Sequence, residues 1–165
     1  MKLTTKDLTL IALFAALTFV SSYIKIPIGP VPITAQTCFV LLTGLLLKPY
    51  AAFLAQVINL LLVIITRGGF GVFQQPSTGF LFGFILAATF IALICQKSQH
   101  VVLLVGTVLI ASLLIYVIGV PYYMVATNTL NIGKALSTVF IPFIIGDLIK
   151  AAIAFVAAAR LRKLI

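Results

Sequence analysis

Six long apolar segments, separated by short polar breaks, make up most of this chain of 165 residues. They cover residues 8–23, 35–47, 50–65, 80–94, 101–118 and 136–159. A helix needs about 20 apolar residues to cross the hydrocarbon core of a bilayer. Because 63% of the residues are hydrophobic and only 8% are charged, a water-soluble domain of this size has no interior large enough to bury them. The sequence therefore predicts an all-α integral membrane protein with six transmembrane helices, forming one domain over residues 1–165.

The basic side chains predict which side of the membrane each loop faces. With both termini in the cytoplasm, seven basic residues lie inside and three lie outside. The inner set is Lys2, Lys6, Lys48, Lys97, Arg160, Arg162 and Lys163, and the outer set is Lys25, Arg67 and Lys134. Since cytoplasmic loops carry the excess of Lys and Arg, we expect cytoplasmic termini. This placement also accounts for the net charge of +9, so no nucleic-acid partner is expected.

The last apolar segment carries the two charges found within the predicted spans, Asp147 and Lys150. Three residues apart, they lie on one face of a helix. A charged side chain at the bilayer centre costs about 2.5–3.5 kcal/mol on insertion scales, so it usually faces a cavity, a partner or a substrate. The alternative is an ion pair that only fixes helix packing. We favour a binding site, because the predicted outer loops above the pair are polar or aromatic.

Two of those outer loops have compositions typical of lids. Residues 25–37 contain three prolines and are expected to form a stiff, extended connection that leads into the second segment through Gln36. Residues 66–79 are rich in glycine and contain Arg67. That arginine binds either an anion or lipid headgroups, and the sequence leaves both open.

Two further polar residues have two interpretations each. Asn59 lies three residues after Gln56 in the third segment, and such amides bind either another helix or a ligand. In the fifth segment, Gly119 and Pro121 are expected to end the helix. Tyr122 then follows either as an interfacial anchor or as an aromatic wall of a cavity.

Small residues in the first segment predict a helix-packing surface. Ala12, Ala15 and Ala16 include an Ala-x-x-x-Ala pair, a spacing that allows another helix to approach closely. From the spacing alone, that helix belongs either to this chain or to a separate protein.

Catalysis and conduction are both disfavoured by the sequence. The chain has two acidic residues and one histidine, and it lacks a nucleophile–base pair and a Gly-x-x-x-x-Gly-Lys phosphate-binding loop. Cys38 and Cys95 lack the spacing of a metal site and are expected to be buried apolar residues. We therefore expect no enzyme activity, no metal and no cofactor. A channel is disfavoured because the inner half of every apolar segment is almost wholly apolar.

Four sequence segments occur in an order that is typical of one family. They are IPIGPVPITAQTCFVLLTGLLL at 26–47, RGGFGVFQQPSTGFLFGF at 67–84, YVIGVPYY at 116–123 and IPFIIGDLIKAA at 141–152. Together they resemble the BioY family of biotin-binding substrate (S) components of energy-coupling factor (ECF) transporters. The resemblance implies a six-helix S-component bundle with cytoplasmic termini in the bacterial cell membrane. It also implies an outward-facing biotin pocket, closed by the loops at 25–34 and 66–78. An S component for another vitamin is the alternative.

The resemblance also implies roles for individual residues. Asp147 and Lys150 match polar binding residues of the family, with Asp147 accepting ureido N–H groups and Lys150 donating to the ureido oxygen or a carboxylate. Arg67 is expected to hold the valerate carboxylate of biotin, with Gln36 and Asn59 as further contacts. Tyr122 stands where many members have tryptophan and is expected to pack on the bicyclic ring.

The same resemblance implies partner proteins. The Ala12, Ala15 and Ala16 surface looks like the one with which S components dock on a transmembrane coupling protein. Two cytoplasmic ATPases complete such an ABC transporter and use the ATP. The expected partners of this chain are therefore biotin, the coupling protein, the two ATPases and membrane lipid.

Overall fold

The computed structural model describes residues 3–27, 30–98 and 100–162. Lys2 and Lys163 of the predicted inner basic set, and residues 28–29 of the proline-rich loop, lie outside the described residues. The helices are α1 (Thr5–Ser21), α2 (Gln36–Leu46), α3 (Pro49–Thr66), α4 (Thr78–Lys97), α5 (Val101–Ala126), α6 (Ile132–Val139) and α7 (Ile144–Leu161). Two strands, β1 (Lys25–Ile26) and β2 (Ile33–Thr34), and two 3₁₀ helices, Gly69–Gln74 and Ile141–Phe143, complete the described structure.

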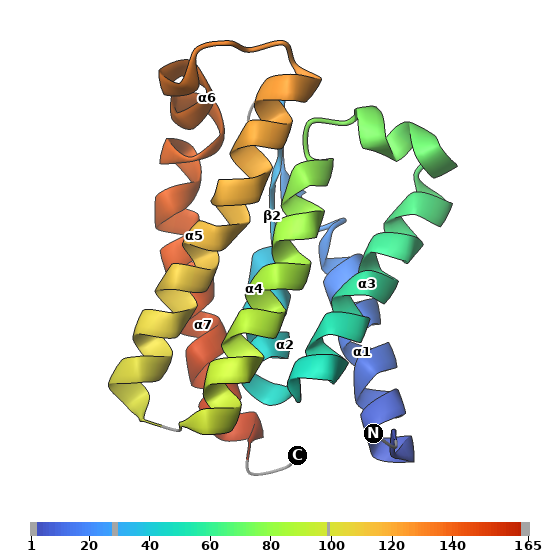
Figure 1. Ribbon diagram of the computed structural model, residues 1–165, viewed down its shortest axis with the longest axis vertical. Helices are drawn as coiled ribbons and strands as arrows, with labels where there is room; N and C mark the ends of the chain where they lie inside the picture. Colours follow the sequence, from blue (N-terminus) through green and yellow to red (C-terminus); the bar gives the residue numbers. More distant parts are fainter. Residues whose placement is uncertain (1–2, 28–29, 99, 163–165) are drawn as a thin grey trace.

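The long helices run alternately up and down between two ends of the molecule (Figure 1). α1 begins and α7 ends at one end, while the β-hairpin, the first 3₁₀ helix and α6 lie at the other (Figure 1). Four segments are long and apolar enough to cross a membrane: Pro49–Thr66, Thr78–Lys97, Val101–Ala126 and Ile132–Leu161. The chain is thus a multi-pass membrane protein. α1 has 17 residues and α2 has 11, so a count of six spans stays a prediction.

The helices begin where the sequence supplies the expected signals. Thr4 and Asp7 form a capping box at the start of α1, which satisfies backbone N–H groups that lack a partner within the helix. Pro49 is the first residue of α3, a position where its missing N–H costs nothing. The side chain of Asn131 accepts a hydrogen bond from the N–H of Lys134 and caps α6.

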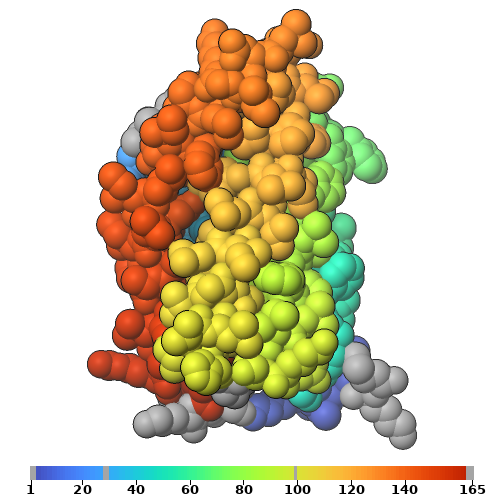
Figure 2. Space-filling model, turned by 60° about the vertical axis from the view of Figure 1, so that its left-hand side comes forward, coloured from blue at the N-terminus to red at the C-terminus, as the bar shows by residue number. Residues whose placement is uncertain are grey.

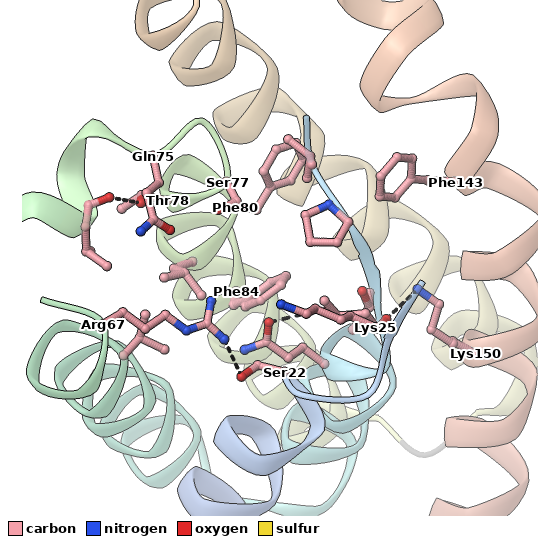
Figure 3. A pocket seen from close by; sticks show the side chains of 18 residues that line it. Ser22, Lys25, Arg67, Gln75, Ser77, Thr78, Phe80, Phe84, Phe143 and Lys150 are labelled. Carbon is pink, nitrogen blue, oxygen red and sulfur yellow. Dashed lines mark hydrogen bonds between the residues drawn. The ribbon is translucent and has the colours of Figure 1, made fainter. Parts of the chain in front are cut away.

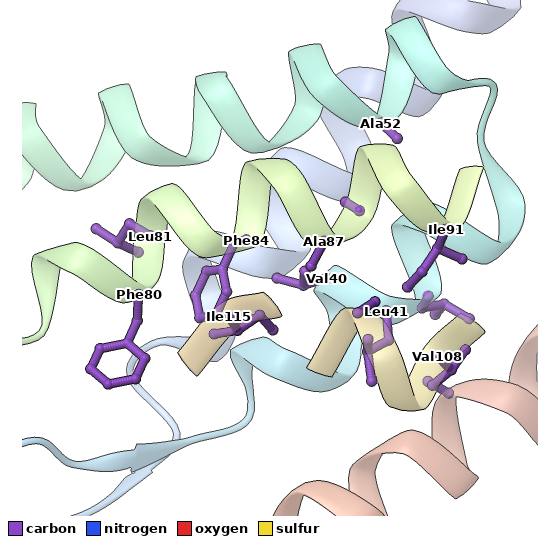
Figure 4. Close-up of a cluster of buried hydrophobic side chains, with 14 of the residues drawn as sticks. Val40, Leu41, Ala52, Phe80, Leu81, Phe84, Ala87, Ile91, Val108 and Ile115 are labelled. Atoms are coloured by element: carbon purple, nitrogen blue, oxygen red, sulfur yellow. The ribbon is translucent and has the colours of Figure 1, made fainter. Parts of the chain in front are cut away.

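α4 is the central helix of the bundle. Its 18-residue apolar window is 61% buried, against 33% or less for the other three candidate spans. Ala87, Ala88 and Ile91 of α4 are fully buried and pack against α2 and α3 (Figure 4). At Gly44 of α2, a Cβ atom would lie 2.7 Å from the carbonyl oxygen of Ala88, so only glycine permits this close approach of α2 to α4.

Two predictions about helix ends were wrong. α5 does not stop at Gly119 and Pro121 but continues to Ala126. A proline is tolerated inside a membrane helix where tertiary packing supports the freed backbone group. Here Gly119 packs directly against the ring of Phe80, which a Cβ atom would approach to 2.4 Å.

The last apolar segment was predicted as one helix over 136–159, and it is broken instead. α6 ends at Val139 and α7 begins at Ile144, with the 3₁₀ turn between them. Pro142 explains the break, because proline disfavours the helical conformation of the residue before it and donates no backbone hydrogen bond. Asp147 therefore lies in the first turn of α7.

The proline-rich connection was predicted as a stiff, extended segment, and its two arms are extended but pair with each other. β1 and β2 form an antiparallel hairpin in which Lys25 pairs with Thr34 and Ile26 with Ile33. The hairpin stands at the same end of the molecule as the first 3₁₀ helix (Figure 1). These two elements, rather than an irregular loop, cover that end of the bundle.

Candidate functional site

A cavity lies beneath the hairpin and the first 3₁₀ helix, among residues from both ends of the chain (Figure 3). Three basic residues line it: Lys25 from β1, Arg67 at the end of α3 and Lys150 from α7. Neither of the chain's two acidic residues lines this cavity. The electrostatic field in the cavity therefore favours a ligand with a negative or hydrogen-bond-accepting group.

The opposite wall of the cavity is apolar and partly aromatic. Phe80 and Phe84 of α4 and Phe143 of the second 3₁₀ helix line it (Figure 3). Aromatic rings offer flat apolar surface, while the basic and amide groups fix orientation, which is the usual division in small-molecule sites. The cavity thus suits a small ligand that has both hydrogen-bonding or negatively charged groups and an apolar part.

Asp147 and Lys150 form an ion pair in the structure. Lys150 Nζ lies 2.6 Å from Asp147 Oδ1 and donates a 3.0 Å hydrogen bond to the carbonyl oxygen of Thr34 in β2. Asp147 and Ala151 are buried while Ile149 is exposed, so the face of α7 that carries Asp147 packs inside the bundle. Lys150 thereby ties α7 to the hairpin that covers the cavity.

Asp147 lies behind Lys150 and does not line the cavity. Its second oxygen, Oδ2, accepts a hydrogen bond from the hydroxyl of Tyr116 in α5. Tyr116 was not anticipated from the sequence, where it is one aromatic residue in an apolar helix. The contact joins residues 31 positions apart, and no local pattern signals it.

Arg67 points into the cavity from the end of α3 (Figure 3). It donates a 2.6 Å hydrogen bond to Ser22 Oγ and lies 5.8 Å from the ring centroid of Tyr23. Within the described part of the chain, no carboxylate forms an ion pair with it. Arg67 is therefore held in place by neutral groups.

Gln36 lines the cavity at the start of α2. Its Oε1 accepts a long 3.5 Å hydrogen bond from Thr34 Oγ1. Its Nε2 is buried and has no hydrogen-bond partner among the described residues. A buried donor without a partner is costly, so Gln36 has a donor available for a ligand or a water.

The two amides of α3 have different surroundings. Gln56 Nε2 donates to Thr18 Oγ1 at 3.4 Å and to Thr43 Oγ1 at 3.3 Å, so for Gln56 the helix–helix interpretation is confirmed. Asn59 is fully buried, and neither its Nδ2 nor its Oδ1 has a partner within the described residues. It is not a lining residue; Val63, one turn further along α3, is.

Tyr122 lies outside the cavity. Its hydroxyl donates a 2.5 Å hydrogen bond to the carbonyl oxygen of Phe73 in the first 3₁₀ helix. Its ring centroid is 6.3 Å from that of Phe82. The structure thus places Tyr122 where it holds the covering loop, and not where it would pack on a ligand in the cavity.

The three alanines of α1 do not share one surface. Ala12 and Ala16 are exposed, whereas Ala15 is 1% exposed and packs inside the bundle. Ala15 therefore belongs to the interface between helices of this chain. Only Ala12 and Ala16 remain available to a separate partner.

The other acidic residue, Asp7, lies at the opposite end of the molecule. Hydrogen bonds from the Tyr50 hydroxyl and from Thr4 hold the pKa of Asp7 well below its usual range. Lys48 Nζ adds an ion pair at 3.2 Å. Asp7 thus joins the start of α1 to the turn between α2 and α3, remote from the cavity. In the described part of the chain, no three His, Cys, Asp or Glu side chains gather as a metal site.

A comparison with protein families identifies the chain. The model of the BioY family matches residues 1–165, the full length of the chain. The chain belongs to the BioY family. The relatives of this BioY chain include "Biotin transporter BioY" of Thermotoga maritima, 36% identical over 92% of this chain and 93% of that protein. "Probable biotin transporter BioY" of Bacillus subtilis is 35% identical over 95% of this chain and 90% of that protein.

A solved structure has the same fold as this BioY chain. It is the crystal structure of the S component for biotin from an ECF-type ABC transporter, with a TM-score of 0.85 and 28% identity. The match covers 98% of this chain and 95% of that one. The S-component fold and the family membership inferred from the four sequence segments are therefore confirmed.

Proposed function

We propose that this chain is the high-affinity biotin-binding S component of an ECF-type ABC transporter, located in the bacterial cell membrane. The observation that carries the proposal is the covered cavity, which combines three basic side chains with an aromatic wall. It occurs in a chain whose relatives are named biotin transporters. Biotin combines a ureido group, a carboxylate and an apolar body, which matches the basic, amide and aromatic groups that line the cavity.

The carboxylate of biotin is assigned to Arg67. Its guanidinium is oriented by Ser22 and has no acidic partner within the described residues, and a planar guanidinium matches a carboxylate in two parallel hydrogen bonds. Lys25 lies on the same cavity wall and adds positive charge.

The ureido group is assigned to Lys150, Gln36 and Asn59. Lys150 and Gln36 line the cavity and donate to the ureido oxygen. Asn59 is fully buried with both polar atoms unpaired, so it becomes a contact if ligand entry opens space beside Val63. Asp147 orients Lys150 in the ligand-free arrangement, and its direct acceptance of ureido N–H groups requires the 2.6 Å ion pair to open.

The hairpin and the loop at 66–78 act as the two covers of the site. Lys150 contacts the hairpin through the carbonyl oxygen of Thr34, so binding of a ligand by Lys150 and closure of the hairpin are linked. In this proposal six spans carry the site, the termini are cytoplasmic, and biotin enters from the outer side.

ATP-driven transport requires partners, because the sequence has no nucleotide-binding loop. We assign them as a transmembrane coupling protein and two cytoplasmic ATPases, with Ala12 and Ala16 of α1 as part of the docking surface. Small residues on an exposed face let a partner helix approach closely. The chain itself uses no cofactor and performs no catalysis.

The decisive experiment is titration calorimetry of the purified, detergent-solubilised protein with biotin, with thiamine and riboflavin as controls. Tight one-to-one binding of biotin alone is expected. A folded, monodisperse sample that binds one of the other vitamins instead would overturn the biotin assignment and leave the S-component fold intact.

A further inference from the structure

An apolar groove separates α5 from α7 on the side of α7 that faces away from the cavity. Tyr116 and Asp147 lie in this groove, among apolar side chains such as Leu113 and Leu148. The face formed by α5 and α7 is visible in Figure 2. The Tyr116–Asp147 contact thus stands between the membrane-facing groove and Lys150, which lines the cavity.

Asp147 divides its two oxygens between the two sides. Oδ1 lies 2.6 Å from Lys150 Nζ, and Oδ2 accepts the hydrogen bond of the Tyr116 hydroxyl. A buried carboxylate is stable only when its charge and its hydrogen-bonding capacity are both satisfied. Lys150 supplies the opposite charge, and Tyr116 supplies the donor on the side of the groove. The lining of the groove is otherwise mostly apolar, and the hydroxyl of Ser112 there donates to the carbonyl oxygen of Val108.

The ring of Tyr116 is fixed by two aromatic neighbours. Phe80, which lines the cavity, meets it edge to face with ring centroids 5.8 Å apart. Phe140 meets it edge to face at 4.9 Å. Such contacts define the orientation of a ring, so the hydroxyl is aimed at Asp147 by packing from the cavity wall and from the α6–α7 connection.

We propose that Tyr116 is a positioning residue of the ligand site, which holds the Asp147 carboxylate so that Lys150 points into the cavity. This inference rests on the proposed function, in which Lys150 binds the ureido group of biotin. Without the hydroxyl, Asp147 Oδ2 faces the apolar groove with no donor. The carboxylate is then free to rotate away from Lys150, and Lys150 loses its fixed position.

The test is a double-mutant cycle of Tyr116→Phe and Asp147→Asn, with biotin affinity measured by calorimetry. Tyr116→Phe keeps the ring and removes only the hydroxyl, and we expect it to weaken biotin binding about tenfold, as for loss of a hydrogen bond to a charged group. Because Tyr116 acts through Asp147, the double variant is expected to bind no more weakly than Asp147→Asn alone. Tyr123→Phe, which removes the hydroxyl of another buried tyrosine of α5, is the matched control and should bind like wild type.

Infrared spectroscopy reports the Tyr116–Asp147 hydrogen bond directly, whereas biotin affinity reports its effect on the site. The chain has only two acidic side chains, Asp7 and Asp147, so the Asp147 band can be assigned by its absence from Asp147→Asn. Tyr116→Phe is expected to shift that band, and Tyr123→Phe is not. If Tyr116→Phe fails to fold, the same hydrogen bond can be tested from its acceptor. Asp147→Asn should then shift the C–O stretching band of a tyrosine.

The outcomes separate this inference from the proposed function. Wild-type protein that binds no biotin would overturn the proposed function. Wild-type protein that binds biotin, with Tyr116→Phe equally tight or with losses that add in the double variant, would overturn the positioning role alone. An unchanged carboxylate band in Tyr116→Phe would overturn it as well.

Discussion

The hydroxyl of Tyr122 donates a 2.5 Å hydrogen bond to the carbonyl oxygen of Phe73, and so ties α5 to the 3₁₀ helix beside the cavity. A second bond of this kind, from Thr78 Oγ1 to the carbonyl oxygen of Val72, is also 2.5 Å long. At Gly79, a Cβ atom would lie 2.3 Å from Tyr122 Cβ. The backbones of α4 and α5 therefore approach each other closely below the loop. The covering loop is thus fastened to both helices.

Tyr122→Phe is expected to loosen this loop without changing the fold. Loss of one neutral hydrogen bond costs about 0.5–1.5 kcal/mol, so amide hydrogen exchange within Gly69–Gln74 should accelerate severalfold. Biotin should dissociate faster by a similar factor, while its association is little changed. Tyr123→Phe is the control. Equal exchange in the two variants would show that the Tyr122 hydroxyl does not hold the loop.

Asp7 predicts a pH dependence of stability at the other end of the molecule. Its pKa is held below the usual value by hydrogen bonds from Tyr50 and Thr4, whereas in the unfolded chain it returns to about 3.9. Ionised Asp7 therefore stabilises the fold above about pH 4, and this contribution is lost as the pH falls further. Asp7→Asn should lower the melting temperature by a constant amount from about pH 5 to 8, and the difference should shrink below about pH 4. A pH-independent difference would contradict this role.

Much of the fold could be predicted because bilayer physics acts through local patterns. Apolar segment length predicts helices, and the alternation of alanines with isoleucines along α7 predicts which face is buried, as Ala151 and Ile149 confirm. The effect of each proline could not be predicted from such local patterns. Pro142 breaks the last apolar segment, whereas α5 continues through Pro121. A proline bends or ends a helix according to what packs against it, and that is a tertiary property.

The candidate site was only partly predictable, for a related reason. Lys150 was identified because a charged group inside a membrane is costly and therefore rare. Arg67 and Gln36 were identified because they lie in the two predicted covering loops, and the family resemblance implied their roles. The position of Tyr122 outside the cavity and the partner of Asp147 depend on contacts across the bundle. Tyr116, which supplies that partner, has no distinguishing sequence context.

Ala16→Trp tests the proposed docking surface of α1. Ala16 is exposed, so a larger side chain fits without disturbing the bundle but prevents close approach of a partner helix. Biotin binding should stay at the wild-type level, and association with the coupling protein should be lost in a pull-down from membranes that contain both. Ala152→Trp, at an exposed alanine of α7, is the matched control. Normal assembly of Ala16→Trp would remove this face from the interface.

Variants of the Asp147–Lys150 pair are expected to change the stability of the protein and its affinity for biotin to different extents. Asp147→Asn should weaken biotin binding more than about tenfold, because Lys150 loses the carboxylate that fixes its position. The protein should stay folded, because Lys150 still donates its hydrogen bond to the carbonyl oxygen of Thr34. Lys150→Met leaves the buried carboxylate without an opposite charge, which typically costs about 3–5 kcal/mol, so it should lower both stability and affinity. The double variant should recover stability, measured as melting temperature in detergent, but not affinity. Recovery of both would mean that the pair serves helix packing alone, and loss of neither in the single variants would remove it from the site.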